Sequence, residues 1–263
     1  MTGSLPQFEI VATPEAVCRW MIGRDDALPD DMPTAGDEVP LTWLFFLRCQ
    51  PATATSIHAA LGRDPDRGLF GGVRYVRERP VRVGDILSSQ ARITDRKTVD
   101  SPRGAMVLST LTNEWSVNGR LAVTETVRMV DLPPGPPVPP AAGPEADATL
   151  APLGDAVSFT PRQIAWLTVE TGDLNPLHVD RNYATGRLFS DVVVPGTLIA
   201  PLVEKRLSHA AGAPVSMLDI RFRAATYPGE SIVVTAAQHE GGWAFEIVGS
   251  GRVRAAGSAE VAS

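Results

Sequence analysis

Hydrophobic and polar residues alternate along several stretches of the chain, and this period of two predicts β-strands. In the first half the alternation runs through residues 86–94, 108–116 and 120–130. Asn118-Gly119 separates the last two stretches, and this dipeptide favours the two-residue turn of a β-hairpin. We therefore expect an antiparallel sheet in the first half.

The second half repeats this order of elements, which indicates an internal duplication. In each half, a turn that joins glycine to an acidic residue precedes the first long strand. In the second half, that strand is expected over residues 231–238. The turn signals are Gly84-Asp85 in the first half, and Gly229-Glu230, Gly241-Gly242 and Ser250-Gly251 in the second.

A helix is predicted ahead of the second-half strands. Thr160 fits its N-cap position, Pro161 its first helical position and Gln163 its third, a combination that forms a capping box. Gly172 should end the helix, because glycine adopts the left-handed conformation that helix C-termini need.

A further helix is expected over residues 197–211, after Pro195-Gly196 and before Gly212. Pro201 lies early in this stretch and removes an internal hydrogen bond. The helix therefore either begins after Pro201 or is kinked there.

The first half is expected to open with a helix over residues 14–22, and a second apolar stretch follows at residues 43–47. Glycines cluster in residues 68–72 and predict a turn before the strands begin.

Prolines concentrate in residues 132–152, which read LPPGPPVPPAAGPEADATLAP. Proline opposes both helix formation and strand pairing, so this segment is predicted to be a linker. A ligand for a polyproline-binding domain is the alternative, but the position between two patterned halves favours a spacer. We expect an N-terminal domain over residues 1–131 and a C-terminal domain over residues 153–263, each large enough for its own core.

The composition, 44% hydrophobic and 21% charged residues, is typical of a folded globular protein. The net charge is -6 and no basic stripe is present, so nucleic acid is not an expected partner. The sequence shows neither a secretory signal nor an apolar stretch long enough to span a bilayer. A cytoplasmic protein without membrane association is therefore expected.

The two cysteines, Cys18 and Cys49, form no CxxC pair and no zinc-ligand cluster with the four histidines. A phosphate-binding loop and a dinucleotide fingerprint are also not visible. We expect no metal site and no redox cofactor.

The segment around Asp173 and His178 carries the candidate chemistry. Gly172 and Pro176 constrain the chain there, so the acid and the histidine could converge on one point. Two such groups about one water apart can divide the proton transfers that hydration of a double bond requires. The alternative is structural: Asp173 and Asn175 would satisfy their own backbone, and His178 would be a partly buried histidine.

Gly172-Asp173-Leu174-Asn175-Pro176-Leu177-His178, followed after five residues by Ala184, resembles the hydratase 2 signature of MaoC-like, R-specific enoyl-CoA hydratases. Residues 157–261 look like a complete MaoC-like domain, and residues 68–130 look like the dehydratase half that accompanies it. The layout, with Leu-Thr-Trp-Leu-Phe-Phe at residues 41–46, is similar to two-part mesaconyl-CoA hydratases and mitochondrial type 2 hydroxyacyl-thioester dehydratases. Those relatives often carry a histidine-containing variant of the loop, so layout and motif leave the substrate open.

This resemblance implies an α+β fold, a tandem hot-dog in which each half is a long helix wrapped by an antiparallel sheet. It also implies that only the second half carries the catalytic loop, because His58 of the first half has no matching acid nearby. The first half then has a binding and structural role. A lost second site would leave space there for a long or branched acyl group.

The implied reaction is the reversible hydration of a 2-enoyl thioester to a 3-hydroxyacyl thioester. Asp173 and His178 would hold one water, and Asn175 would orient the loop or the water. The backbone N–H of Gly196, at the expected helix start, would stabilise the enolate oxygen. Pro195 stands where relatives commonly have histidine, which removes a side chain from the pocket and leaves the Gly196 amide.

The expected substrate is a small-molecule acyl thioester, with coenzyme A or an acyl carrier protein as the thiol carrier, and no separate cofactor. A dehydratase for carrier-bound intermediates is therefore a close alternative. A hot-dog thioesterase and a non-catalytic acyl-binding protein are alternatives of other classes. Pairing into a homodimer of double hot-dogs is left open. Cationic partners for phosphates of coenzyme A would come from Arg181, Arg187, Arg221 and Arg223.

Overall fold

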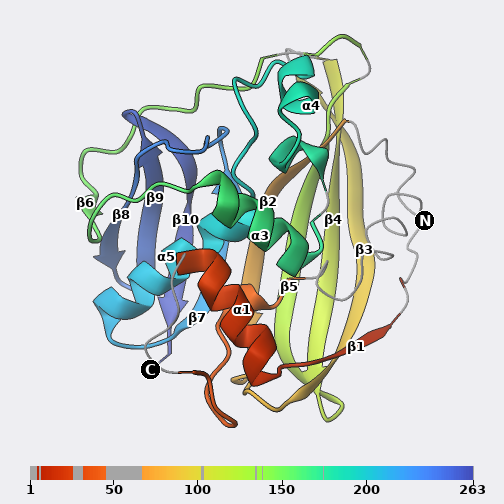
Figure 1. Cartoon of the computed structure of the whole chain (residues 1–263), viewed down its shortest axis with the longest axis vertical. Coiled ribbons are helices and arrows are strands. Elements are labelled where there is room, and N and C mark those ends of the chain that lie inside the picture. Colours follow the sequence, from red (N-terminus) through yellow and green to blue (C-terminus); the bar gives the residue numbers. More distant parts are fainter. Residues whose placement is uncertain are drawn as a thin grey trace.

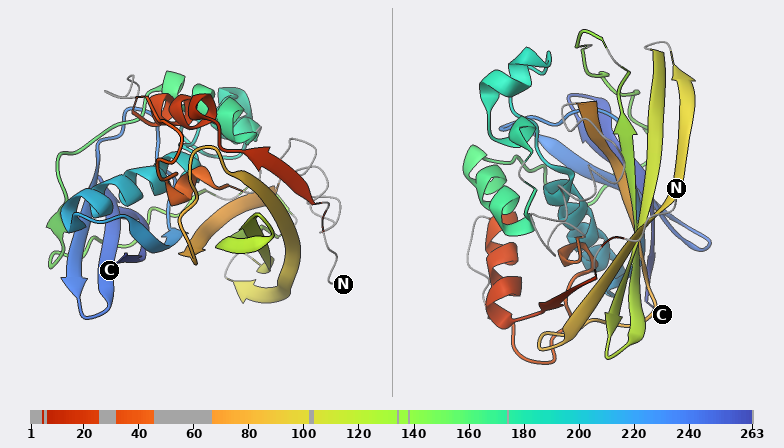
Figure 2. Two further views of the ribbon diagram at one scale, coloured as in Figure 1. Left: turned by 90° about the horizontal axis from the view of Figure 1, so that it is seen from below. Right: turned by 90° about the vertical axis from the view of Figure 1, so that its right-hand side faces the viewer.

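The computed structural model describes residues 5, 7–25, 32–45, 67–101, 104–133, 135–137, 139–173 and 175–262. These residues form one ten-stranded antiparallel sheet with the described helices on one side (Figures 1 and 2). Cys49, His58 and part of the apolar stretch at residues 43–47 lie outside the described residues. Among the described helices, none is long and apolar enough to cross a membrane.

The first half supplies five strands, and the predicted hairpin is confirmed. Asn118 and Gly119 form its turn with φ angles of 52° and 70°, both in the left-handed region that this turn needs. The five strands are β1 (Phe8–Val11), β2 (Gly68–Arg77), β3 (Ile86–Ser101), β4 (Gly104–Val117) and β5 (Arg120–Asp131).

The second half repeats this arrangement in the described residues. The sheet order is β1-β3-β4-β5-β2-β7-β10-β9-β8-β6, so β2 and β7 meet at the centre and similar strands lie on either side of this seam. The expected internal duplication is thus present in the fold. The second-half strands are β6 (Ala151–Pro152), β7 (Val215–Phe222), β8 (Ile232–His239), β9 (Gly242–Gly249) and β10 (Arg252–Val261).

The glycine-rich segment at residues 68–72 is a strand and not the predicted turn. It begins β2, with a register shift between Phe70 and Gly72. A Cβ atom at Gly72 would lie 2.3 Å from the carbonyl oxygen of Ile220 on β7. The glycine therefore allows β2 and β7 to approach, and local sequence could not reveal this because the partner strand is far away in the chain.

The predicted helices of the second half are confirmed. Helix α3 (Pro161–Thr171) starts with the expected capping box and ends at Gly172, whose φ is 72°. Helix α5 (Gly196–Ala211) begins before Pro201, which excludes the later start, one of the two alternatives left open by the sequence. Pro201 is the sixth residue of this helix, so the hydrogen bond that an N–H there would donate to the Thr197 carbonyl is absent.

Helix α5 is the long helix that the second-half sheet wraps, as a hot-dog fold requires. Figure 2 shows α1 (Pro14–Asp25) and α3 as an outer layer over α5. Trp166 of α3 donates from its indole nitrogen to the carbonyl of Arg19, 3.1 Å away, and so joins these outer helices. Hydrophobic side chains of α5 and of both halves of the sheet form one continuous core.

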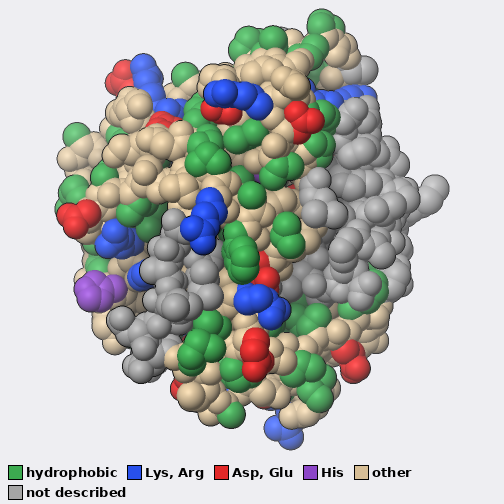
Figure 3. All heavy atoms as spheres, in the orientation of Figure 1, with side chains coloured by type: hydrophobic (Ala, Val, Ile, Leu, Met, Phe, Trp, Pro, Cys, Tyr) green, Lys and Arg blue, Asp and Glu red, His purple; other side chains and the backbone are tan. Residues whose placement is uncertain are grey.

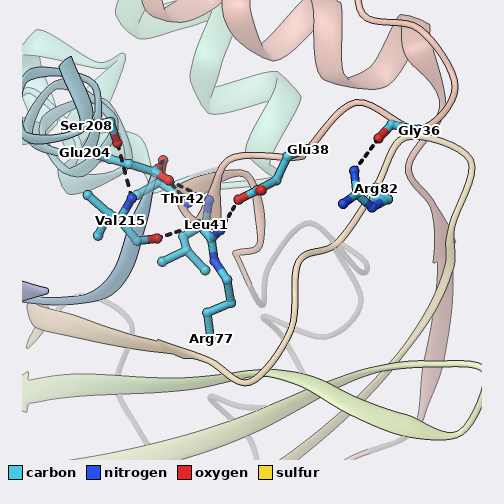
Figure 4. A network of polar contacts seen from close by, with 9 residues as sticks. All are labelled: Gly36, Glu38, Leu41, Thr42, Arg77, Arg82, Glu204, Ser208 and Val215. Carbon is cyan, nitrogen blue, oxygen red and sulfur yellow. Dashed lines mark hydrogen bonds and ion pairs between the residues drawn. The ribbon is translucent and has the colours of Figure 1, made fainter. Parts of the chain in front are cut away.

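A buried carboxylate links α5 to the first half (Figure 4). Glu204 accepts hydrogen bonds from the backbone N–H groups of Leu41 and Thr42 at 2.7 and 3.0 Å, and from the Thr42 hydroxyl at 2.5 Å. These donors belong to the 3₁₀ helix η1 (Leu41–Trp43). Arg77 of β2 lies nearby and bonds Glu38 and the Val215 carbonyl, so charged groups from both halves meet here.

The proline-rich segment packs on the second half. The Pro144 carbonyl accepts from the Val253 amide at 2.9 Å, and the Asp147 amide donates to Glu246 at the same distance. Pro152 pairs with β8 at the sheet edge, so the expectation that proline prevents strand pairing is wrong at this end. An edge strand tolerates proline because one side of it needs no partner.

Candidate active site

The loop from Gly172 to His178 folds through two side-chain turns that follow α3. Gly172 closes the helix, and the Asp173 Oδ1 atom then accepts from the Asn175 amide at 3.4 Å. The Asn175 Oδ1 atom accepts from the Leu177 amide at 3.0 Å and caps the 3₁₀ helix η4 (Pro176–His178). Asn175 therefore shapes the loop, and its side-chain oxygen is already occupied by this cap.

The loop brings Asp173 and His178 together. The His178 Nε2 atom lies 3.5 Å from the Asp173 Oδ2 atom, and the two side chains are 11% and 20% exposed. The other ring nitrogen, Nδ1, lies 2.7 Å from the carbonyl oxygen of Val193. Since a carbonyl can only accept, Nδ1 must carry the hydrogen, and Nε2 is the nitrogen that gains or loses a proton.

The surroundings of His178 raise its pKa above the ordinary value of 6.5. Burial of the ring lowers the pKa and is the largest single influence. The negative charge of Asp173, the hydrogen bond to Asp173 and the hydrogen bond to Val193 each raise the pKa. Together they outweigh the effect of burial. The imidazolium form is thus favoured beside an ionised carboxylate.

The segment that holds His178 leads directly into α5. The Val193 amide donates to the Leu177 carbonyl at 3.0 Å, and the Val194 amide donates to the Thr226 carbonyl at 2.8 Å. Val193 and Gly196 are three Cα–Cα steps apart, so their Cα atoms are at most about 11 Å apart. The histidine is therefore fixed close to the start of this helix.

Gly196 begins α5, and its N–H has no hydrogen-bond acceptor within the described part of the chain. A Cβ atom at Gly196 would lie 2.4 Å from Phe222 and 2.9 Å from Phe70. No larger residue fits unless these rings move. The helix N-terminus thus presents an unpaired N–H group where negative charge is favoured.

Two halves of the chain supply the aromatic side chains over Gly196. Phe70 of β2 lies between Phe45 and Phe222, with ring centroids 5.8 and 5.3 Å away. Sequence analysis missed both Phe70 and Phe222. Phe70 lies in the glycine-rich segment that the sequence predicts to be a turn, so no strand face could be assigned to it. The alternation of residues 218–222, in contrast, is a signal that could have placed Phe222 on the inner face.

Arg181 and Arg187 lie on and beside the short helix α4 (Arg181–Gly186), just after the loop. Arg181 pairs with Asp191 at 2.7 Å and its side chain is 71% exposed. The Arg187 guanidinium lies 4.5 Å from the centre of the Tyr183 ring. Both are on the side of the sheet that carries the helices, so they stay candidates for phosphate contacts.

Arg221 and Arg223 do not join this site. Phe222 between them points to Gly196, and neighbouring residues of a strand point to opposite faces. Arg221 lies 3.5 Å from Asp219, and Arg223 lines a shallow groove with Ala256 on the outer face. Both arginines therefore lie on the face of the sheet opposite Gly196, because local alternation gave their shared face but not which face is inward.

Charged side chains are interspersed by sign on the face of the molecule shown in Figure 3. Within the described residues, no group of three or more His, Cys, Asp or Glu side chains could hold a metal ion.

Residues 146–257 match the family model described as MaoC like domain. The second half is a MaoC-like domain. Residues 32–125 match the model described as FAS1-like, dehydratase domain region, so the first half contains a dehydratase region. The resemblance drawn from the loop motif is thereby confirmed at the level of the domains.

One curated relative is the mitochondrial 3-hydroxyacyl-[acyl-carrier-protein] dehydratase FERN of Solanum lycopersicum. It is 32% identical over 82 residues, which are 31% of this chain and 50% of that protein. The chain thus matches about half the length of this relative.

Solved structures of similar fold cover the whole chain. HtdX of Mycobacterium tuberculosis has a TM-score of 0.72 at 20% identity, with all of both chains covered. The peroxisomal multifunctional enzyme type 2 of Drosophila melanogaster has a TM-score of 0.69 at 16% identity, over 99% of this chain and 48% of its own. These likenesses confirm the double hot-dog fold.

Proposed function

We propose that the protein catalyses the reversible hydration of a 2-enoyl thioester to a 3-hydroxyacyl thioester. The observation that carries this proposal is the approach of Asp173 and His178 to within 3.5 Å, beside a helix that starts with an unpaired N–H. An acid, a base and a donor for the carbonyl oxygen are the three groups that this reaction needs.

In the hydration direction, Asp173 takes a proton from water as the water oxygen bonds to the β carbon. His178, protonated at Nε2, delivers a proton to the α carbon. The raised pKa of His178 supports its role as the acid, since the imidazolium is the form beside the carboxylate. A proton shift from Asp173 to His178 restores the pair, and dehydration follows the same steps in reverse.

Negative charge develops on the thioester oxygen during this reaction, and the Gly196 N–H is proposed to stabilise it. The helix dipole of α5 acts in the same direction. The tight contact of Phe222 and Phe70 with Gly196 excludes water from one side of the helix start, which strengthens a hydrogen bond there.

Either coenzyme A or an acyl carrier protein fits as the thiol carrier. Arg181 and Arg187 are the proposed partners for coenzyme A phosphates, because both extend from the segment that follows the loop. The name of the tomato relative favours a carrier-protein thioester instead. Turnover of matched coenzyme A and carrier-protein thioesters separates these substrates. A long or branched acyl group remains a prediction that a chain-length series tests.

The test is the change in enoyl-thioester ultraviolet absorbance with enoyl and 3-hydroxyacyl substrates on both carriers. Asp173→Asn and His178→Ala should each lower the rate by about a hundredfold or more. His239→Ala is the matched control, because this histidine is exposed on β8, and it should keep the wild-type rate. Release of free thiol with no 3-hydroxyacyl thioester formed from the enoyl thioester would indicate a thioesterase and contradict the proposal.

A further inference from the structure

A small cavity lies where α5 faces the first half of the chain. It has a volume of about 10 Å³, close to the least room that one water-sized group requires. Its walls come from α5, from η1 and the Phe45 that follows it, and from β2. The lining includes Thr42, Phe45, Phe70, Tyr75, Gly196 and Thr197.

Three side-chain hydroxyl groups line this cavity, and two of them are engaged by carboxylates. The Thr42 hydroxyl donates to Glu204 at 2.5 Å, and the Tyr75 hydroxyl lies 3.5 Å from Glu125. The third, Thr197 Oγ1, is buried and has no hydrogen-bond partner in the described part of the protein. Thr197 as a whole is only 8% exposed.

An unpaired buried hydroxyl is rare in native proteins and often marks a place where a ligand or water binds. Thr197, Ala200 and Pro201 lie at i, i+3 and i+4 and share the face of α5 that lines the cavity. Gly196 lines the same cavity and carries the unpaired N–H at the helix start. Two neighbouring residues that each carry an unpaired hydrogen-bond donor thus line one space of oxygen-atom size.

We infer that the Thr197 hydroxyl is a second donor to the thioester carbonyl oxygen, alongside the Gly196 N–H. This inference rests on the proposed function, because it assigns a further group to the same site. The apolar rings of Phe45 and Phe70 keep the two donors away from bulk water, which favours binding of one oxygen with developing negative charge.

The inference is tested with variants that change the hydroxyl and little else. Thr197→Val keeps the shape and should lower kcat about ten- to hundredfold with a smaller change in KM, as expected for a transition-state donor. Thr197→Ser restores a hydroxyl and should recover most of the rate. Thr168→Val is the matched control: this buried α3 threonine donates to the Ile164 carbonyl, away from the cavity. It should keep the wild-type kcat.

A second readout is independent of turnover. Crotonyl-CoA labelled with ¹³C at the thioester carbonyl would be bound to Asp173→Asn, and the carbonyl stretch would be recorded by infrared difference spectroscopy. A hydrogen bond to the oxygen lowers this frequency. The lowering should be smaller in Asp173→Asn/Thr197→Val and should return in Asp173→Asn/Thr197→Ser.

The outcomes separate this inference from the proposed function. Suppose that the wild type is active and that the valine variants keep both its kcat and its carbonyl stretch. This result overturns the role of Thr197 and leaves the acid-base pair in place. A wild type that binds thioesters without hydrating them overturns the proposed function, while the carbonyl stretch still decides the role of Thr197. A wild type that binds no thioester overturns both.

Discussion

His178 shows how neighbouring groups set the chemistry of one residue. Its ring is held at Nδ1 by the Val193 carbonyl and at Nε2 by Asp173. Burial alone would favour neutral imidazole, yet the net effect of these partners is a raised pKa. The raised pKa therefore favours a protonated His178 next to Asp173, the group proposed to take a proton from water.

This raised pKa predicts how stability depends on pH. The stabilisation from charged His178 is fully present below its unfolded pKa and is lost as pH rises through the raised folded value. From about pH 6 to pH 9, the free energy of unfolding should therefore fall more for the wild type than for Asp173→Asn. Urea titrations across this range measure it. Parallel curves for the two proteins would contradict the coupling between Asp173 and His178.

Gly196→Ala is expected to lower both activity and stability, because its Cβ would lie 2.4 Å from Phe222 and 2.9 Å from Phe70. Overpacking of this kind costs about 1–3 kcal/mol. Displacement of the rings or of the helix start should also reduce kcat about tenfold or more. Activity assays and urea titration measure the two effects.

Gly186→Ala is the control for this substitution. Gly186 also lies in a helix, and a Cβ there would have no atom within 4 Å. It should leave rate and stability near the wild-type values. An active, fully stable Gly196→Ala protein would show that the aromatic contacts do not require glycine.

At the scale of elements, the contact between η1 and α5 depends on one buried carboxylate. Glu204 is 6% exposed and satisfies three donors of Leu41 and Thr42. The contact therefore fixes η1, and the Phe45 that follows it, against the helix that starts the candidate site. Local sequence signals for α5 contain no hint of this role, since the partners are more than 160 residues apart.

Glu204→Gln should destabilise the protein by about 2–4 kcal/mol. One carboxylate oxygen would become an amide nitrogen, which cannot accept from the donors that face it. The remaining oxygen would also lose the negative charge that strengthens its hydrogen bonds. Urea denaturation measures the change. Glu240→Gln, at an exposed position after β8, should be neutral by comparison. Equal midpoints for the two variants would argue that the Glu204 contacts contribute little.

At the scale of the whole molecule, the candidate site depends on both halves. The acid, the histidine and the helix start come from the second half, whereas Phe45 and Phe70 of the first half cover Gly196 and the adjoining cavity. The seam between β2 and β7 makes this possible, and Arg128 of β5 reinforces it through two hydrogen bonds to Asp219 at 2.8 and 3.0 Å. The first half thus has a structural part in the site even though its own residues include no described histidine.

The sequence by itself determined the local features. The capping box of α3, the Asn118-Gly119 hairpin and the loop from Gly172 to His178 follow from short-range hydrogen bonds and φ preferences. Such signals lie within a few neighbouring residues, so they could be interpreted without knowledge of the fold. They were enough to indicate antiparallel strands in each half and a candidate Asp173 and His178 pair.

Only the tertiary structure decided which distant residues meet. The glycine-rich segment became a strand because β7 approaches Gly72, and Arg221 and Arg223 point outward because Phe222 packs against Gly196. The Thr197 hydroxyl is likewise unpaired only because of the fold. The hydroxyls of Thr42 and Tyr75 meet the carboxylates of Glu204 and Glu125, whereas no acceptor or donor lies within reach of the Thr197 hydroxyl in the described residues. Side-chain packing and pairing between strands far apart in the chain set these outcomes, and neither leaves a local pattern in the sequence.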